Sequence, residues 1–193
     1  MRAIERMIKT ANECKKLRDY NAVFAIVSGL NLVSVSRLKV TWEAVDPRRV
    51  KHLRDLEAFV SPTGNYKVYR QAVEALDPRE YRIPIISLFL KDLFFMNEGN
   101  PKYIEVVESM DKAKKLINME KLFNSYDKVV VFCNTKFNPP LDPSAHTSEA
   151  NARSLVENMK TLKESALYKY SCLCEAKSGD AEVNLRSKWM TEG

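Results

Sequence analysis

Apolar residues recur every three or four positions along almost the whole chain, and this spacing is the feature that most constrains its fold. Residues three and four apart lie on the same face of an α-helix, so each such stretch predicts an amphipathic helix with one buried face. Alternation of apolar and polar residues, the pattern of a half-buried strand, is scarce. The sequence therefore predicts an all-α protein.

The N-terminal part of the chain contains signals for three successive helices. Residues 2–18 place their apolar side chains on one stripe, which predicts a helix with one buried face. Asn21 is expected to cap the next helix, in which residues 22–27 are apolar on every side, as is typical of a helix at the centre of a core. A shorter helical segment is expected at 33–38, and Trp42 is expected to anchor the connection that follows.

Proline and glycine mark the limits of the next helices. Asp46 and Pro47 are a strong start signal, with aspartate as the N-cap and proline at the first helical position. Residues 61–65 have the composition of a turn, and 66–76 form another helical stripe. These signals predict helices joined by turns, with no internal repeat.

A long apolar helix is expected at 85–96, opened by Pro84 and ended by the Gly- and Pro-containing segment 97–101. The next apolar stretch, 110–132, closes with three consecutive valines, which fit either a helix end or a short strand. Residues 134–149 are rich in Pro, Asn and Ser and are expected to form a long loop.

The end of the chain is expected to contain a last helical hairpin, over 152–173, before a polar tail. The tail, 177–193, lacks an apolar period and is expected to be flexible. We therefore predict one domain over 1–176 followed by the tail.

Composition supports a globular protein without bound metal. Of the 193 residues, 45% are hydrophobic, which is enough for a core. The chain contains no uninterrupted apolar run of about 18 residues and no secretion signal, so a cytoplasmic location is expected. The four cysteines are too scattered for a disulfide framework, and with two isolated histidines they give no spacing typical of a zinc site. Cofactors and metals are therefore not expected.

The formal charge of +6 allows an acidic partner such as nucleic acid or anionic lipid. The basic residues are interleaved with acidic ones, however, which is more typical of solvated helix faces. A nucleic-acid partner is not expected, although a basic helical protein that binds polyanions stays an alternative, and its binding should weaken steeply with salt.

Four separated strings of residues indicate a known family. They are NAVFAIVSGLNLVSVSRLKVTW at 21–42, TGNYKVYR at 63–70, PIISLFLKDLFFMNEGNP at 84–101, and ALYKYSCLCEA at 166–176. In these strings the chain resembles the catalytic domain of Ras-family guanine nucleotide exchange factors, the RasGEF domain, and the resemblance covers about residues 2–176. The string TGNYKVYR also resembles the subgroup that includes the Ras guanyl-releasing proteins.

The resemblance implies a mechanism without covalent chemistry. In this family a protruding helical hairpin, here about 85–126 with its second helix beginning near Met110, opens the bound G protein and releases its nucleotide. By motif position, Phe94 matches the apolar residue that crowds the magnesium site. Glu98 matches the acid that competes for groups otherwise holding the α-phosphate. The implied partner is a Ras-family small GTPase of the Ras or Rap type.

The same resemblance implies a set of residues that hold switch II of the GTPase. Each also has a simpler interpretation, because apolar stripes usually form the core, asparagine often caps a helix, and a tyrosine often packs. Arg37 is expected to be a structural partner in an ion pair. The implied GTPase-binding residues are Phe24, Leu30, Asn31, Ser36, Asn65, Tyr66, Ile85 and Asn100.

The family match also implies that the opening helices of the domain are missing, because Met1 falls inside the region that the family treats as the middle of the domain. We therefore expect an N-terminally truncated RasGEF-like helical domain. The alternative function is a catalytically inactive scaffold that still binds a small GTPase or an adaptor. Recruitment to the inner face of the plasma membrane is expected to come through partners.

Overall fold

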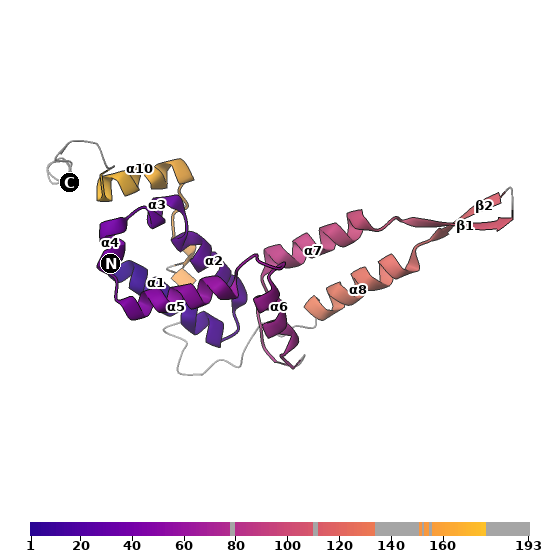
Figure 1. Ribbon diagram of the computed structural model, residues 1–193, viewed down its shortest axis with the longest axis horizontal. Coiled ribbons are helices and arrows are strands. Elements are labelled where there is room, and N and C mark those ends of the chain that lie inside the picture. The colour runs from indigo at the N-terminus through magenta and orange to yellow at the C-terminus, as the bar shows by residue number, and fades with distance from the viewer. Residues whose placement is uncertain (78–79, 110–111, 134–150, 152, 155, 177–193) are drawn as a thin grey trace.

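The computed structural model describes residues 1–77, 80–109, 112–133, 151, 153–154 and 156–176. It shows a helical body from which a long arm extends (Figure 1). The body contains α1 (Arg2–Lys16), α2 (Tyr20–Leu30), α3 (Val33–Ser36), α4 (Lys39–Glu43), α5 (Pro47–Phe59), α6 (Lys67–Glu74) and α10 (Glu164–Cys174). The arm contains α7 (Ile86–Gly99), β1 (Tyr103–Ser109), β2 (Lys112–Ile117) and α8 (Met119–Cys133).

The core of the body lies where α1, α2 and α5 pack together. Ile8, Val23 and Leu56 are 0%, 0% and 1% exposed, one from each of these helices. A cluster of three aromatic rings joins α2, α5 and α6, with ring centroids 5.3 Å apart for Tyr20 and Phe59 and 5.7 Å apart for Tyr20 and Tyr69. Because aromatic pairs in such tilted and edge-on geometries are favourable beyond their burial, this cluster fixes α6 to the body.

Helix capping confirms one prediction and corrects another. Asp46 caps α5 as expected, since its carboxylate accepts a hydrogen bond from the backbone N–H of Arg48 at 2.8 Å. The prediction that Asn21 caps α2 is wrong: Asp19 caps it, accepting from the N–H of Ala22 at 2.9 Å. Asn21 is the second residue of α2, two positions after the cap, and its side-chain oxygen accepts a hydrogen bond from the N–H of Ile86 instead.

The predicted all-α class is confirmed, because most of the described chain is helical. A small two-stranded sheet forms the tip of the arm (Figure 1). The expectation that the second hairpin helix begins near Met110 is wrong. Strands β1 and β2 pair antiparallel there, with Tyr103 opposite Ile117, and α8 begins only at Met119. The β-branched and aromatic residues of β1 favour an extended chain once a partner strand is beside them.

The helical segment expected at 33–38 is shorter than predicted and is followed by a separate helix, α4, which includes Trp42. The indole Nε1–H of Trp42 donates to the backbone oxygen of Val35 at 3.0 Å, so this side chain does anchor the connection between α3 and α4. The three valines that close the 110–132 stretch belong to α8 rather than to a strand.

Hydrogen bonds from α3 and α4 hold the C-terminal helix α10 against the body. Arg37 donates to the backbone oxygens of Ser171 and Glu175 at 2.8 and 2.9 Å, which makes it a structural residue that binds carbonyl groups. The Glu175 carboxylate accepts from the N–H groups of Val40 and Thr41 at 3.2 and 2.7 Å, at the start of α4. A carboxylate at a helix N-terminus satisfies N–H groups that have no partner within the helix.

The loop predicted at 134–149 and the tail predicted at 177–193 lie outside the described residues. Residues 151, 153–154 and 156–157 are helical, so part of the first helix of the predicted last hairpin is observed. Within the described part of the chain, no helix has the length and apolarity needed to cross a membrane.

We predict that the attachment of α10 weakens in acid. The hydrogen bond from the Thr41 hydroxyl is the main reason that the pKa of Glu175 lies below its ordinary value of 4.5. Because the folded-state pKa is lowered, this stabilisation is complete above the ordinary value and is lost as the pH falls through the folded-state pKa. Hydrogen-exchange protection factors of α10 should therefore drop as the pH falls below the ordinary value of 4.5.

The variant Glu175→Gln should show the same loss of α10 protection at neutral pH. Glu120→Gln, a charge-matched change on the arm, should leave α10 protection unchanged. Equal protection of α10 in both variants at neutral pH would contradict the role of Glu175.

Candidate functional site

The base of α7 is fixed in the core of the body. Ile85 and Leu88 are 1% and 5% exposed. The backbone N–H of Ile85 donates to the Tyr69 hydroxyl at 3.1 Å, and the N–H of Ile86 donates to the side-chain oxygen of Asn21 at 3.3 Å. Of the predicted GTPase-binding residues, Ile85 therefore lies in the core, where it supports the arm rather than presenting a surface.

The two predicted catalytic residues lie four positions apart on α7, and hence on one face of that helix. Phe94 is 60% exposed, and its ring makes an edge-on contact with Phe95, with 5.7 Å between centroids. Glu98 is exposed in the last turn of α7 and accepts a hydrogen bond from the Asn97 amide at 3.0 Å. This face, which we call the contact face, presents an apolar ring and a carboxylate to solvent together.

A turn with left-handed backbone lies beside the base of α7. Gly64, Asn65 and Tyr66 have φ of 61°, 57° and 61° in succession. Such angles are uncommon for a bulky side chain, and conformations of this kind are often found at functional sites. We call these three residues the left-handed turn.

The left-handed turn brings three predicted GTPase-binding residues together. The rings of Tyr66 and Phe24 lie with their centroids 6.4 Å apart. Lys91 of α7 lies 5.2 Å from the centroid of the Tyr66 ring and donates to the side-chain oxygen of Asn65 at 3.3 Å. Phe24, Asn65 and Tyr66 therefore form one surface at the start of the arm.

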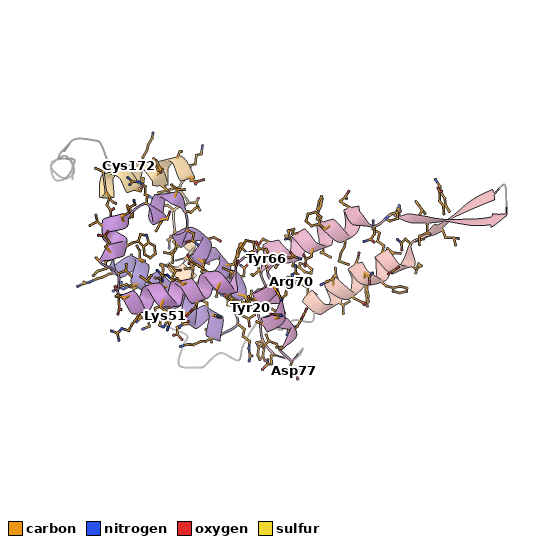
Figure 2. All side chains as sticks on the ribbon, viewed as in Figure 1. Tyr20, Lys51, Tyr66, Arg70, Asp77 and Cys172 are labelled. Atoms are coloured by element: carbon orange, nitrogen blue, oxygen red, sulfur yellow. The ribbon has the colours of Figure 1, made fainter. Side chains whose placement is uncertain are left out.

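Arg70 joins this turn to the arm, and the sequence alone did not indicate it. Its Nε–H donates to the backbone oxygen of Asn65 at 2.8 Å, and its two terminal nitrogens donate to the two Asp92 oxygens, each at 2.8 Å. The hydrogen bonds to Asp92 raise the pKa of Arg70 above its ordinary value, since they stabilise the charged guanidinium. Figure 2 shows Tyr66 and Arg70 close together where the arm leaves the body.

Two hollows contain most of the other predicted residues. One, of about 630 Å³, lies between the left-handed turn and the arm and is lined by Asn65, Asp92 and Asn100 among others. The second, of about 220 Å³, lies on the body and is lined by Leu30, Asn31 and Ser36 together with Trp42 and residues of α5. The predicted residues thus lie in the body hollow, in the hollow beside the left-handed turn, on the surface formed by Phe24, Asn65 and Tyr66, and on the contact face. Ile85 is buried in the core instead, and Leu30, although it lines the body hollow, is also buried, at 6% exposed.

The site presents kinds of side chain that protein-binding surfaces use. Among the described residues, no group of three or more His, Cys, Asp or Glu side chains is placed to hold a metal ion. The exposed groups are apolar rings, amides and single charges spread over the body and the arm. Such groups can bind and reshape a partner protein.

Comparison with known proteins identifies the family. The model of the RasGEF domain matches residues 1–123, and the chain therefore belongs to the RasGEF domain family. The strings that suggested this resemblance include the residues of the left-handed turn and of the contact face.

Individual relatives are similar over most of this chain. Rap guanine nucleotide exchange factor 5 from Homo sapiens is 35% identical over 166 residues, covering 83% of this chain and 27% of the relative. Rap guanine nucleotide exchange factor 6 is 37% identical over 122 residues, covering 63% of this chain and 7% of the relative. Rap guanine nucleotide exchange factor-like 1, also human, is 31% identical over 178 residues, covering 91% and 25%. The chain thus spans about a quarter or less of the length of these relatives.

We predict that the Arg70–Asp92 pair stabilises the junction of body and arm. Both side chains are mostly shielded, at 27% and 21% exposed, and the pairing is bidentate. Arg70→Ala and Asp92→Ala should each lower the free energy of unfolding by about 1–2 kcal/mol, since each leaves a half-buried charge without its partner. A double-mutant cycle should give a coupling energy of about 1 kcal/mol in denaturant unfolding.

The exposed pair Lys16–Glu13, at 64% and 50% exposed, is the matched control. Its coupling energy should be at most about 0.5 kcal/mol, because solvent screens it. If the two cycles give the same coupling energy, the Arg70–Asp92 pair is only an ordinary surface pair.

Proposed function

We propose that this protein is a guanine nucleotide exchange factor that promotes release of GDP from a Ras-family small GTPase of the Ras or Rap type. Membership of the RasGEF family and the names of the similar proteins support this proposal. The observation that supports it best is the contact face, where exposed Phe94 and Glu98 lie side by side on a helix fixed in the core at its base.

The contact face has the chemistry needed to weaken nucleotide binding. A G protein holds its nucleotide through backbone N–H groups, a lysine and Mg²⁺. An apolar ring in the metal shell excludes the oxygen ligands that Mg²⁺ needs. A carboxylate near the phosphate site competes for the groups that hold the phosphate. We propose that Phe94 supplies the first effect and Glu98 the second.

The remaining predicted residues would hold the GTPase while the arm acts. We propose that the body hollow with Leu30, Asn31 and Ser36, and the surface formed by Phe24, Asn65 and Tyr66, bind switch II, with Asn100 contacting the GTPase beside the arm. Each tenfold gain in release rate needs about 1.4 kcal/mol of barrier reduction, which must come from contacts that are stronger in the nucleotide-free state. Nucleotide and exchange factor must therefore weaken each other's binding reciprocally.

In this proposal the protein needs no cofactor of its own and makes no covalent bond to its partner. It acts in the cytoplasm, and partners recruit it to the inner face of the plasma membrane, where Ras-type GTPases would be met. Nucleic acid is not a partner in this proposal.

The contact face is tested by the double variant Phe94→Ala with Glu98→Ala. Stimulated release of fluorescent GDP from Ras or Rap should slow by at least about tenfold, because both effects on the nucleotide site are removed. The helical circular-dichroism signal should not change, since both side chains are exposed. Phe123→Ala on α8, where the ring is also 60% exposed, is the matched control and should release GDP at the parent rate.

The outcomes separate the exchange factor from the inactive scaffold. If the parent is active and the double variant stimulates GDP release at the same rate, the contact face has no role in exchange. A parent that binds nucleotide-free Ras or Rap without accelerating release would favour the scaffold. Binding to polyanions that falls steeply with salt, without binding to any GTPase, would favour the polyanion binder.

The docking surface is tested by Phe24→Ala. Truncation of an aromatic anchor at an interface centre can cost about 2 kcal/mol, so the affinity for nucleotide-free GTPase should fall about thirtyfold. Isothermal titration with nucleotide-free Ras or Rap measures this change, and thermal unfolding checks that the variant is folded. Equal affinity in a folded variant would mean that Phe24 only packs within the body.

A further inference from the structure

The last turn of α7 is held by a side chain from α8. The Lys121 ammonium donates to the backbone oxygens of Asn97 and Asn100, at 2.7 and 2.9 Å. The final carbonyl groups of an α-helix have no partner within the helix and carry partial negative charge. A lysine from a neighbouring helix supplies hydrogen-bond donors for these carbonyl groups and a positive charge beside them. Lys121 therefore caps the C-terminal end of the helix that presents Glu98.

Asn118 completes this contact from the start of α8. It is 7% exposed, and its amide donates to the backbone oxygen of Pro101 at 3.0 Å while its side-chain oxygen accepts from the N–H of Lys121 at 3.1 Å. Its own backbone N–H donates to the oxygen of Lys102 at 3.0 Å. One buried asparagine therefore caps α8 and holds the segment that leaves α7. We call Asn118 and Lys121 the tip brace.

The tip brace lies at the far end of the helix pair from a second contact. Near the base, the rings of Phe89 and Phe132 stack with centroids 4.1 Å apart and planes 16° apart. Two helices joined at both ends resist bending better than a helix fixed only at its base. Asn97, whose oxygen Lys121 binds, directly precedes Glu98, so the brace acts within the turn that presents the carboxylate.

We propose that Asn118 and Lys121 are positioning residues for nucleotide exchange: they hold the last turn of α7 so that the contact face keeps its place against the GTPase. This inference rests on the proposed function. An arm that opens a nucleotide site must stay in place when it contacts the GTPase. If the last turn of α7 were flexible, that turn would move on contact and the nucleotide site would not open. Loss of the brace should therefore slow release at saturation. Of the proposed docking residues only Asn100 touches the brace, while the body hollow and the surface formed by Phe24, Asn65 and Tyr66 stay in place, so binding should change by at most about twofold.

Four single variants test the tip brace. Lys121→Met removes the charge and the donors but keeps an unbranched side chain, and Lys121→Arg keeps both charge and donors. Asn118→Asp keeps the oxygen that caps α8 but loses the donation to Pro101. Lys115→Met is the control, because Lys115 is 69% exposed on β2 and lies 3.8 Å from Glu105 in an exposed pair.

The measurement is the release rate of fluorescent GDP from Ras or Rap over a range of exchange-factor concentrations. Lys121→Met should lower the saturating rate about tenfold, because charge-assisted hydrogen bonds are among the stronger ones, while the half-saturating concentration stays within about twofold. Lys121→Arg should stay within about threefold of the parent rate, and Asn118→Asp should lie between the two. Lys115→Met should match the parent.

A second measurement does not depend on activity. Hydrogen exchange in the isolated chain should be faster in the last turn of α7 for Lys121→Met and Asn118→Asp, and unchanged for Lys115→Met. A general loss of stability would instead speed exchange throughout α7 and lower binding and release together, and would overturn the positioning role.

The outcomes also separate this inference from the proposed function. An active parent with an unchanged saturating rate in Lys121→Met overturns the positioning role alone. A parent that accelerates release from no Ras or Rap protein overturns the proposed function and the positioning role with it. Unchanged exchange at the end of α7 in Lys121→Met overturns the brace itself.

Discussion

Burial of the base of α7 in the core of the body determines where the arm points. Ile85 and Leu88 are in the core, and the Tyr69 hydroxyl accepts the backbone N–H of Ile85. Tyr69 in turn belongs to the aromatic cluster that joins α2, α5 and α6. The direction of the arm is therefore set by the best-packed part of the molecule. A flexible linker at this place would leave the exposed end of α7 without a fixed direction.

Further contacts hold α7 at its middle and at its C-terminal end. Arg70 binds Asp92 and the backbone of Asn65, so the middle of α7 is tied to the left-handed turn. Lys121 binds the end of α7 from α8. The arrangement connects the surface formed by Phe24, Asn65 and Tyr66 with the contact face. In the proposed function this connection lets energy gained in docking act on the nucleotide site.

Local patterns predicted several of the helices but not the contacts that orient them. The Asp46–Pro47 start signal and the apolar stripe of residues 2–18 depend on near neighbours, and both were correct. The strands at the arm tip were missed because β1 is stabilised by its pairing with β2, which no local period reveals. Asp19 and Asn21 are both good capping residues. In the fold Asp19 caps α2, whereas the Asn21 oxygen accepts the N–H of Ile86, a contact between distant residues that the local sequence does not reveal.

In the candidate site, too, the local sequence indicated single residues but not the contacts between distant ones. Phe94, Glu98 and the residues of the turn were indicated by similarity of short strings, and the structure exposes Phe94 and Glu98 on one helix face. Arg70 and Asp92 are 22 residues apart, and Lys121 reaches back to Asn97 and Asn100. Charged residues at such separations have no periodic signal, so only the fold reveals that they meet.

In the proposed function, a fixed arm on a docking body lowers the affinity of a small GTPase for its nucleotide. This is tested by the rate of GDP release from a panel of Ras and Rap proteins as the concentration of this chain is raised, with complex formation followed in parallel. We expect release that accelerates and saturates, and a complex with nucleotide-free GTPase that excess GDP dissociates. A complex that forms equally well with and without GDP, with no acceleration for any member of the panel, would contradict the proposed function.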